Sequence, residues 1–344
     1  YISFQPTDYF NTKLYTGTLA ELAITGVGFQ PDVTWLKSRS AVKNHYLYDS
    51  ARGATKNLAP NDVDVEATTA EGLKSWQSDG FTLGTSGGEN GSAITYASWN
   101  WLGGTTSGIT TNGSTTITPS AYSFNQTSGF SVLAYSGNST SGAKLAHGLG
   151  ATPEMVLVKN LQTENNWSCY HKQMEAAPAD WTIQLDSTAA STNNAGMWND
   201  TEPDDVNITL GNDNGTNGSY NMVAYCFAPI SGYSKFGNYY GNGNADGTFI
   251  YTGFRPAYVL WKRSHATASW MIHTNKFPTF NECNIHLVAN TNAAEVTGAD
   301  GIARSCDLLS NGFKQRGTDT DSNHAGSTYI YAAFAEFPLV SSNS

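Results

Sequence analysis

One ten-residue phrase occurs three times in this chain. It reads GFQPDVTWLK at residues 28–37, GATPEMVLVK at 150–159 and GFRPAYVLWK at 253–262. All three copies have Gly at the first position, Pro at the fourth and Lys at the tenth. Internal repetition of this kind constrains the architecture more than any other feature of a sequence. The chain is therefore predicted to contain three related modules.

Aromatic segments recur around each copy of the phrase. A Tyr-x-Gly element precedes the phrase, in looser form in the third copy, and an aromatic segment closes each module at residues 96–101, 220–227 and 329–334. Proline fixes φ and donates no ladder hydrogen bond, so its place in the phrase suits the entry to a strand. The residues that follow alternate as a strand requires, with Val33 and Trp35 on the same face.

The composition favours an all-β fold. Charged residues make up 13% of the chain, aromatic residues 12%, and glycine accounts for 34 of 344 residues. Helix signals are few, and residues 67–76 are the one segment expected to form two helical turns. We expect tandem antiparallel β-sandwich modules of a jelly-roll or lectin-like type. The predicted divisions are a first module at residues 1–103, a Gly/Ser/Thr-rich linker at 104–128, a second module at 129–231 and a third at 232–344.

Charge and hydropathy exclude some functions. The net charge of −10 favours solubility and argues against binding to a nucleic-acid backbone. No apolar stretch reaches 18 residues, so we expect no insertion into a membrane. Four cysteines occur, without a C-x-x-C pair that would indicate a zinc ribbon or a redox motif. Buried free thiols are favoured, and one disulfide in each later module is the alternative; the cysteines are Cys169, Cys226, Cys283 and Cys306.

Catalytic motifs are weak. Residues 84–88 match G-x-S-x-G around Ser86, but a nucleophile elbow needs a helix after the serine, and a Gly/Asn loop follows instead. The adjacent acids Asp204 and Asp205 could serve a glycosidase only at a separation that a sequence does not reveal. Surface acids are the favoured interpretation. We therefore predict no catalytic residue and a protein that is not an enzyme.

Polar loops before the closing segments are candidate binding sites. They lie at residues 85–92, 212–219 and 318–327, and all end in Gly-Ser. Hairpin turns explain much of this composition, because Asn and Gly tolerate positive φ. The second loop supplies the candidate ligand-binding residues Asn212, Asp213 and Asn214.

The third loop carries the main metal candidate, and Asp213 and Asn214 of the second loop could also contribute ligands. Asp319, Asp321 and Asn323 alternate in the way that oxygen ligands do in calcium loops. The glycine and terminal glutamate of an EF-hand are missing. Calcium is accordingly the one cofactor considered, with a plain hairpin as the alternative.

Tryptophan residues are candidates for stacking on sugar rings. Trp35 and Trp261 occupy nearly equivalent places in the phrase, which favours a structural role. Trp76, Trp181 and Trp198 lie outside the shared strands. We expect these three to be the more exposed and to belong to a ligand-binding surface.

Several phrases resemble a known class of protein. GFSVLAYSGN, NGSYNMVAYCFAPISGYSKFGNYYGNG, FIYTGFRPAYVLWKR and STYIYAAFAEFP are similar to repeat modules in structural proteins of tailed marine bacteriophages. The resemblance covers nearly the whole chain. It implies a virion-associated protein of a tail fibre or appendage, and it supplies no catalytic residues.

These observations give a leading hypothesis and two alternatives. The leading one is a phage virion structural or adhesion protein whose loops contact glycans on the host surface. Its expected partners are other copies of itself, as in the trimers typical of fibre proteins, and other virion proteins. One alternative is a purely structural shaft, decoration or filament protein that self-assembles. The other is a glycan-cleaving enzyme.

Overall fold

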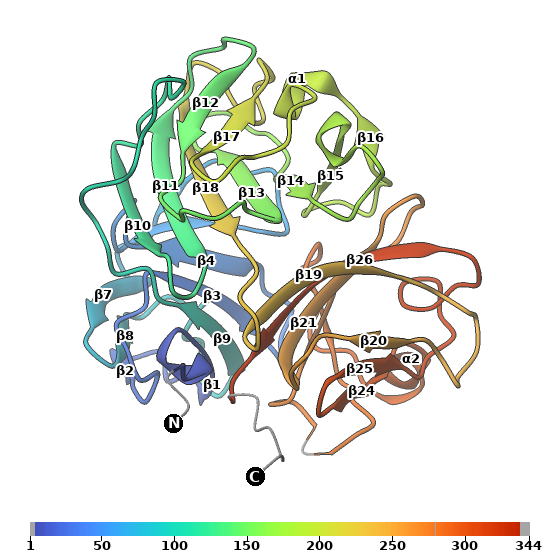
Figure 1. The fold of residues 1–344 in the computed structure, drawn as a ribbon. Coiled ribbons are helices and arrows are strands. Elements are labelled where there is room, and N and C mark those ends of the chain that lie inside the picture. Colours follow the sequence, from blue (N-terminus) through green and yellow to red (C-terminus); the bar gives the residue numbers. More distant parts are fainter. Residues whose placement is uncertain (1–3, 279, 338–344) are drawn as a thin grey trace.

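The computed structural model describes residues 4–278 and 280–337 as a protein built almost entirely from β-strands (Figure 1). Strands account for 39% of the chain and helices for 5%. The strands of each sheet pair antiparallel. The prediction of an all-β protein with antiparallel, sandwich-like sheets is confirmed.

The first module contains a large sheet and a small sheet. A 3-10 turn, η1 (Pro6–Asp8), leads into it. The large sheet has the order β1 (Phe10–Thr16), β9 (Thr95–Trp101), β3 (Val33–Ser38), β4 (His45–Asp49), β5 (Lys56–Leu58) and β6 (Ala67–Thr68). The small sheet has the order β2 (Leu22–Ile24), β8 (Gly80–Leu83) and β7 (Leu73–Gln77).

The second module follows the same plan. Its large sheet has the order β10 (Ala121–Asn125), β11 (Phe130–Ser136), β18 (Asn221–Phe227), β13 (Met155–Asn160), β14 (Ser168–His171), β15 (Trp181–Gln184) and β16 (Thr192–Asn193). The opposing pair is β12 (Ala143–Ala146) and β17 (Asn207–Leu210). Two short helical segments complete it, η2 (Pro178–Asp180) and α1 (Ala195–Trp198).

The third module repeats this order once more. Its large sheet has the order β19 (Ser234–Tyr240), β26 (Thr328–Ala335), β21 (Pro256–Arg263), β22 (Met271–Thr274) and β23 (Leu287–Val288). The small sheet has the order β20 (Phe249–Tyr251), β25 (Gly312–Gln315) and β24 (Cys306–Leu309), and α2 (Gly298–Ala303) lies before it in the chain.

The strand made by each phrase has the same neighbours in every module. β3, β13 and β21 each lie between the closing strand of their module and the next strand of the chain. The closing strands β9, β18 and β26 in turn pair with the strand that carries the Tyr-x-Gly element. Apart from additional edge strands such as β10, the three large sheets thus share one strand order, while a common origin of the modules as repeats stays a prediction.

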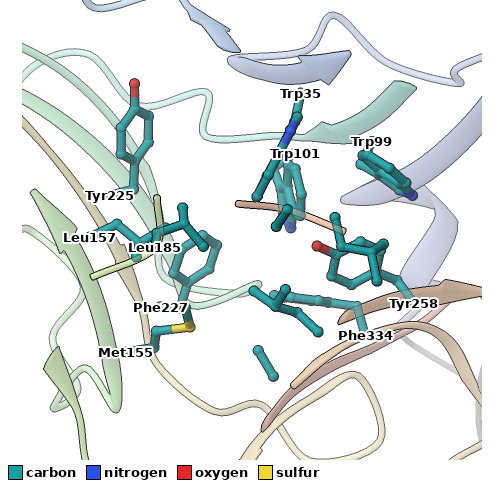
Figure 2. Close-up of a cluster of buried hydrophobic side chains, with 14 of the residues drawn as sticks. Trp35, Trp99, Trp101, Met155, Leu157, Leu185, Tyr225, Phe227, Tyr258 and Phe334 are labelled. Atoms are coloured by element: carbon teal, nitrogen blue, oxygen red, sulfur yellow. The ribbon is translucent and has the colours of Figure 1, made fainter. Parts of the chain in front are cut away.

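One apolar core joins the three large sheets. Trp101, Phe227 and Phe334, from the three closing strands, form a triangle with ring centroids 5.7 to 6.2 Å apart. Figure 2 shows these rings with Trp35 and Leu157 in the same cluster. Aromatic pairs at such distances stabilise a core beyond their buried area. The inner faces of the three sheets therefore pack against one another, and each outer face packs on its own small sheet.

Two local expectations are corrected by strand pairing. The predicted linker at residues 104–128 contains β10, which pairs with β11, so its last part belongs to the second module. Residues 67–76 form parts of β6 and β7 and not two helical turns. Pairing of β7 with β8 overrides the weak helical preference of that segment. Within the described residues, no helix is long and apolar enough to cross a membrane.

Candidate functional site

The lysine of each phrase holds the modules together. Lys37, Lys159 and Lys262 are fully buried. Each Nζ donates to a carbonyl of the loop that follows its own strand, at Lys43, Asn165 and Ala266. Burial lowers the pKa of each ammonium group from 10.5 to about 8. The repeated lysines are therefore internal structural groups and not surface ligands.

Each of these lysines also donates to a neighbouring module. Lys37 Nζ reaches the carbonyl of Asn292 in the third module at 3.3 Å. Lys159 Nζ reaches the carbonyl of Val63 in the first module at 2.6 Å, and Lys262 Nζ reaches the carbonyl of Thr188 in the second module at 3.3 Å. The three contacts together form a closed ring that links each module to the next. The same three carbonyls accept backbone N–H groups of Lys43, Asn165 and Ala268. The repeated phrase therefore has a structural role, because its lysine joins neighbouring modules.

A second ring lies one strand away. Trp167 Nε1 donates to the carbonyl of Ala59 at 2.9 Å, and Trp270 Nε1 donates to that of Gln184 at 2.8 Å. At the equivalent place His45 Nε2 lies 3.1 Å from the carbonyl of Val288. Each contact crosses between modules in the same rotational sense as the lysine contacts.

The polar loops before the closing strands are largely structural. Asn90, Asn217 and Asn323 are fully buried, and each side-chain amide donates to backbone carbonyls within its own module. In the second loop, Asp213 is half-buried and accepts from the N–H of Gly215 at 2.7 Å. Its neighbours Asn212 and Asn214 are exposed.

The calcium candidates meet a positive charge already present in the chain. Arg304 Nε lies 3.0 Å from Asp319 Oδ1 and 3.3 Å from Asp321 Oδ2. Asn323 is buried and bonded to backbone. No group of three or more His, Cys, Asp or Glu residues in the described part of the chain is placed to hold a metal ion. The guanidinium between the two carboxylates argues against calcium there.

The predicted tryptophan surface is corrected in part. Trp198 is buried, with 1% of its surface exposed, and its ring meets that of Tyr170 at 5.9 Å. The prediction of exposure failed because α1 lays the indole on the core of the second module. Trp76 and Trp181 are half-buried and pack against apolar clusters.

The G-x-S-x-G match leads to a buried carboxylate and not to a catalytic triad. Ser86 Oγ donates to Glu89, and the Tyr48 hydroxyl donates to the same carboxylate at 2.5 Å. Glu89 has 1% of its surface exposed. The segment after the serine contains no helix, which an elbow requires.

The third module has an open groove that the sequence did not reveal. Its lining comes mainly from β19 and β20, the two strands labelled in Figure 1, and its volume is about 560 Å³. Three aromatic side chains beside it are unusually exposed for their type: Tyr240 at 65%, Tyr251 at 59% and Phe249 at 44%. Its polar lining includes Gln173, Lys235, Asn238 and Thr248. We call this feature the β19–β20 groove.

Several contacts hold the polar side of the groove in place. Lys235 Nζ donates to the carbonyl of Tyr251 at 2.7 Å and lies 5.2 Å from the centre of its ring. Asn238 Nδ2 donates to the carbonyl of Gln173 at 3.1 Å. At Gly237, a Cβ atom would come within 2.5 Å of the Tyr331 hydroxyl, so only glycine leaves room for that ring in the lining.

The groove exists because β19 is an edge strand. In the second module the corresponding strand, β11, is covered by β10, whereas among the described strands β19 pairs only with β26. None of the six predicted ligand residues lines the groove; they are Trp76, Trp181, Trp198, Asn212, Asp213 and Asn214. The available signal was the run of aromatic residues on both sides of a Gly/Asn turn at residues 239–251.

One known protein family matches this chain over nearly its whole length. The family described as "Domain of unknown function (DUF7483)" matches residues 5–338. The chain belongs to the DUF7483 family. The match spans all three modules and both rings of intermodule contacts. Neither the curated proteins nor the solved structures gave a match.

Proposed function

We propose that this DUF7483 protein is a non-enzymatic adhesion protein that binds a carbohydrate in the β19–β20 groove. The observation that carries the proposal is the exposure of Tyr240, Phe249 and Tyr251 along one open groove. Soluble proteins expose a contiguous aromatic surface mainly where something binds. Sugar rings present apolar C–H faces that stack on such side chains, and their hydroxyls need the hydrogen-bonding groups that the same groove supplies.

The polar groups favour a sugar over an added peptide strand. An exposed edge strand can accept a further strand, and proteins prevent this by placing lysine on the edge. Lys235 lies on β19 and its Nζ crosses to the carbonyl of Tyr251. A peptide that paired with β19 would meet this side chain and the contact between Asn238 and Gln173. A sugar stacked on the exposed rings leaves both contacts in place.

The lining also favours binding over cleavage. Glycoside hydrolysis usually requires two carboxyl groups that flank the bond to be broken. The described residues that line the groove include lysine, amides, hydroxyls and aromatic rings, without an Asp or Glu side chain. The groove thus suits recognition of a glycan that remains intact.

The proposal extends to the setting of the protein. The phrases that resemble phage structural modules support a virion structural protein, placed on a tail fibre or appendage. Attachment through a surface glycan is consistent with a groove open to solvent. Association with further copies and with other virion proteins is part of this proposal.

A glycan array with the purified chain tests the proposal. We expect reproducible binding to a related set of sugars, which Tyr251→Ala weakens roughly 2- to 12-fold if stacking contributes about 0.5–1.5 kcal/mol. Ile302→Ala is the matched control, since Ile302 is 53% exposed in the same module and outside the groove. An array without reproducible binding, or equal losses in the two variants, would reject the proposed site.

A further inference from the structure

Two cysteines face each other in the third module. Cys283 and Cys306 are partners in an isolated antiparallel bridge. The N–H of Cys283 donates to the carbonyl of Cys306 at 2.7 Å, and the N–H of Cys306 donates back at 3.3 Å. Residues that exchange both bonds have Cα atoms about 5.5 Å apart. Disulfides span Cα separations of about 4.4–6.8 Å, so the backbone already has a suitable spacing.

The side chains of this pair share one face. Residues directly opposite in an antiparallel pair point to the same side, and both cysteines belong to the apolar cluster between the two sheets of the module. Both are present as free thiols. Interaction with the Cys306 thiol lowers the pKa of Cys283, whereas burial raises the pKa of Cys306. The thiol of Cys283 is therefore the more readily ionised of the two.

The other two cysteines provide a contrast within the same chain. Cys169 points into the core shared by the three modules, and Cys226 points into the separate core of the second module. They lie opposite adjacent residues of β13, Leu157 and Val156, whose side chains alternate between faces. A disulfide between them would need the sheet to be rebuilt. Of the two disulfides considered from the sequence, one in each later module, only the one in the third module is therefore compatible with the structure.

We propose that Cys283 and Cys306 form a disulfide on oxidation and so tie the segment that follows β22 to β24. In the reaction with oxidised glutathione, the Cys283 thiolate attacks one sulfur, a mixed disulfide forms and one glutathione leaves. The Cys306 thiolate then attacks the Cys283 sulfur, the protein disulfide forms and the second glutathione leaves. The two cysteines give up two electrons and two protons, which the two glutathione molecules carry.

Access for the oxidant requires only a local opening. Cys283 has 3% and Cys306 0% of its surface exposed, so neither reacts in the closed structure. However, Phe280 lies three residues before Cys283 and is 82% exposed. Segments with exposed side chains and few buried contacts open at small free-energy cost compared with global unfolding. Oxidation is therefore expected to be slow in the native protein and to need no denaturant.

Thiol counting tests this inference in the full chain. After incubation with oxidised glutathione and removal of the reagent, denatured protein should contain two reactive thiols where the reduced chain has four. Its mass should fall by about 2 Da, because two hydrogen atoms are lost. Peptide mapping should place the bridge between residues 283 and 306. The oxidised form should melt a few degrees higher, since the bridge closes a loop in the unfolded chain.

Matched variants make the result decisive. On oxidation, the double variant Cys169→Ser/Cys226→Ser should still lose two thiols. The single variants Cys283→Ser and Cys306→Ala should lose none. Circular dichroism checks that every variant is folded. Two single variants are used so that the test still holds if one of them fails to fold. Four thiols after prolonged oxidation, a stable glutathione adduct on Cys283, or a mapped bridge to Cys169 or Cys226 would each overturn the inference. None of these outcomes bears on glycan binding.

Discussion

The indole N–H of Trp167 in the second module donates to the backbone carbonyl of Ala59 in the first module at 2.9 Å. Both residues are buried, so neither the donor nor the acceptor can form a hydrogen bond with water when this one is lost. Two equivalent contacts join the other modules: His45 of the first module contacts the third, and Trp270 of the third module contacts the second. The chain therefore closes on itself in a ring, in which each module contacts the other two.

Loss of this hydrogen bond should be measurable against a matched tryptophan. Trp167→Phe removes the donor and leaves the carbonyl of Ala59 buried, whereas Trp198→Phe removes an indole N–H that has no hydrogen-bond partner among the described residues. Both indoles are fully buried, so the packing losses are comparable. We expect Trp167→Phe to lower the free energy of unfolding by about 1–2 kcal/mol more than Trp198→Phe does. Equal losses in chemical denaturation would contradict this role.

The buried lysines predict an unusual dependence on pH. Lys159 has a pKa of about 8 in the folded chain and an ordinary value of 10.5 when unfolded. Between these values the unfolded state holds more protons, so this group makes folding more favourable as pH rises. Below pH 8 its contribution is constant.

The comparison that isolates this effect uses Lys159→Met. The free energy of unfolding of the wild type, minus that of the variant, should rise between about pH 8 and pH 10. The same measurement with the more exposed Lys74→Met should give a difference that stays level in this range. A constant difference for Lys159→Met would show that the buried amine keeps an ordinary pKa, and a falling difference would show that folding raises it; either would contradict the lowered pKa.

Lys235 should protect the edge of the third module from self-association. Lys235→Val removes the charge from β19 and leaves an apolar, unpaired strand edge. We expect this variant to form dimers or larger species at concentrations where the wild type does not, as seen by analytical ultracentrifugation. Lys172→Val is the control, because Lys172 lies after β14 and outside any strand. Identical behaviour of the two variants would speak against the protective role.

The glycine of the Tyr-x-Gly element should be intolerant of a side chain. At Gly137 a Cβ atom would lie 2.0 Å from the carbonyl oxygen of Gly218, which real contacts do not allow. We expect Gly137→Ala to destabilise the chain by about 2–4 kcal/mol, because backbone must shift. Gly113→Ala, with no atom within 4 Å, should change the melting temperature little. A stable Gly137→Ala variant would show that this close approach of the two loops is dispensable.

The strands of the phrase could be predicted from sequence, and the faces they present could be predicted too. The proline, the alternation after it and the closing aromatic segments placed β3, β13 and β21 correctly. Alternation, however, says which side chains share a face and not what covers that face. The sequence therefore gave no indication that Trp101, Phe227 and Phe334 meet in one core.

The candidate site was harder to predict for a similar reason. The spacing of Asp319 and Asp321 resembles a set of metal ligands. In the structure, however, the Arg304 side chain from another segment lies between the two carboxylates. Trp198 is distant from the repeated strands in sequence, yet it is part of a core. The β19–β20 groove depends on β19 having only one neighbour among the described strands, and the aromatic run at residues 239–251 does not reveal which strands will lie beside it.

The most direct test of the ring cuts the chain between its first two modules. A protease site inserted between Gly113 and Ser114 lies in an exposed segment, and cleavage there removes the only covalent connection between the first module and the rest. If the modules share one core, the two fragments should elute together at the size of the intact chain and unfold in a single transition. Separation of the first module as a folded fragment of its own would contradict the shared core.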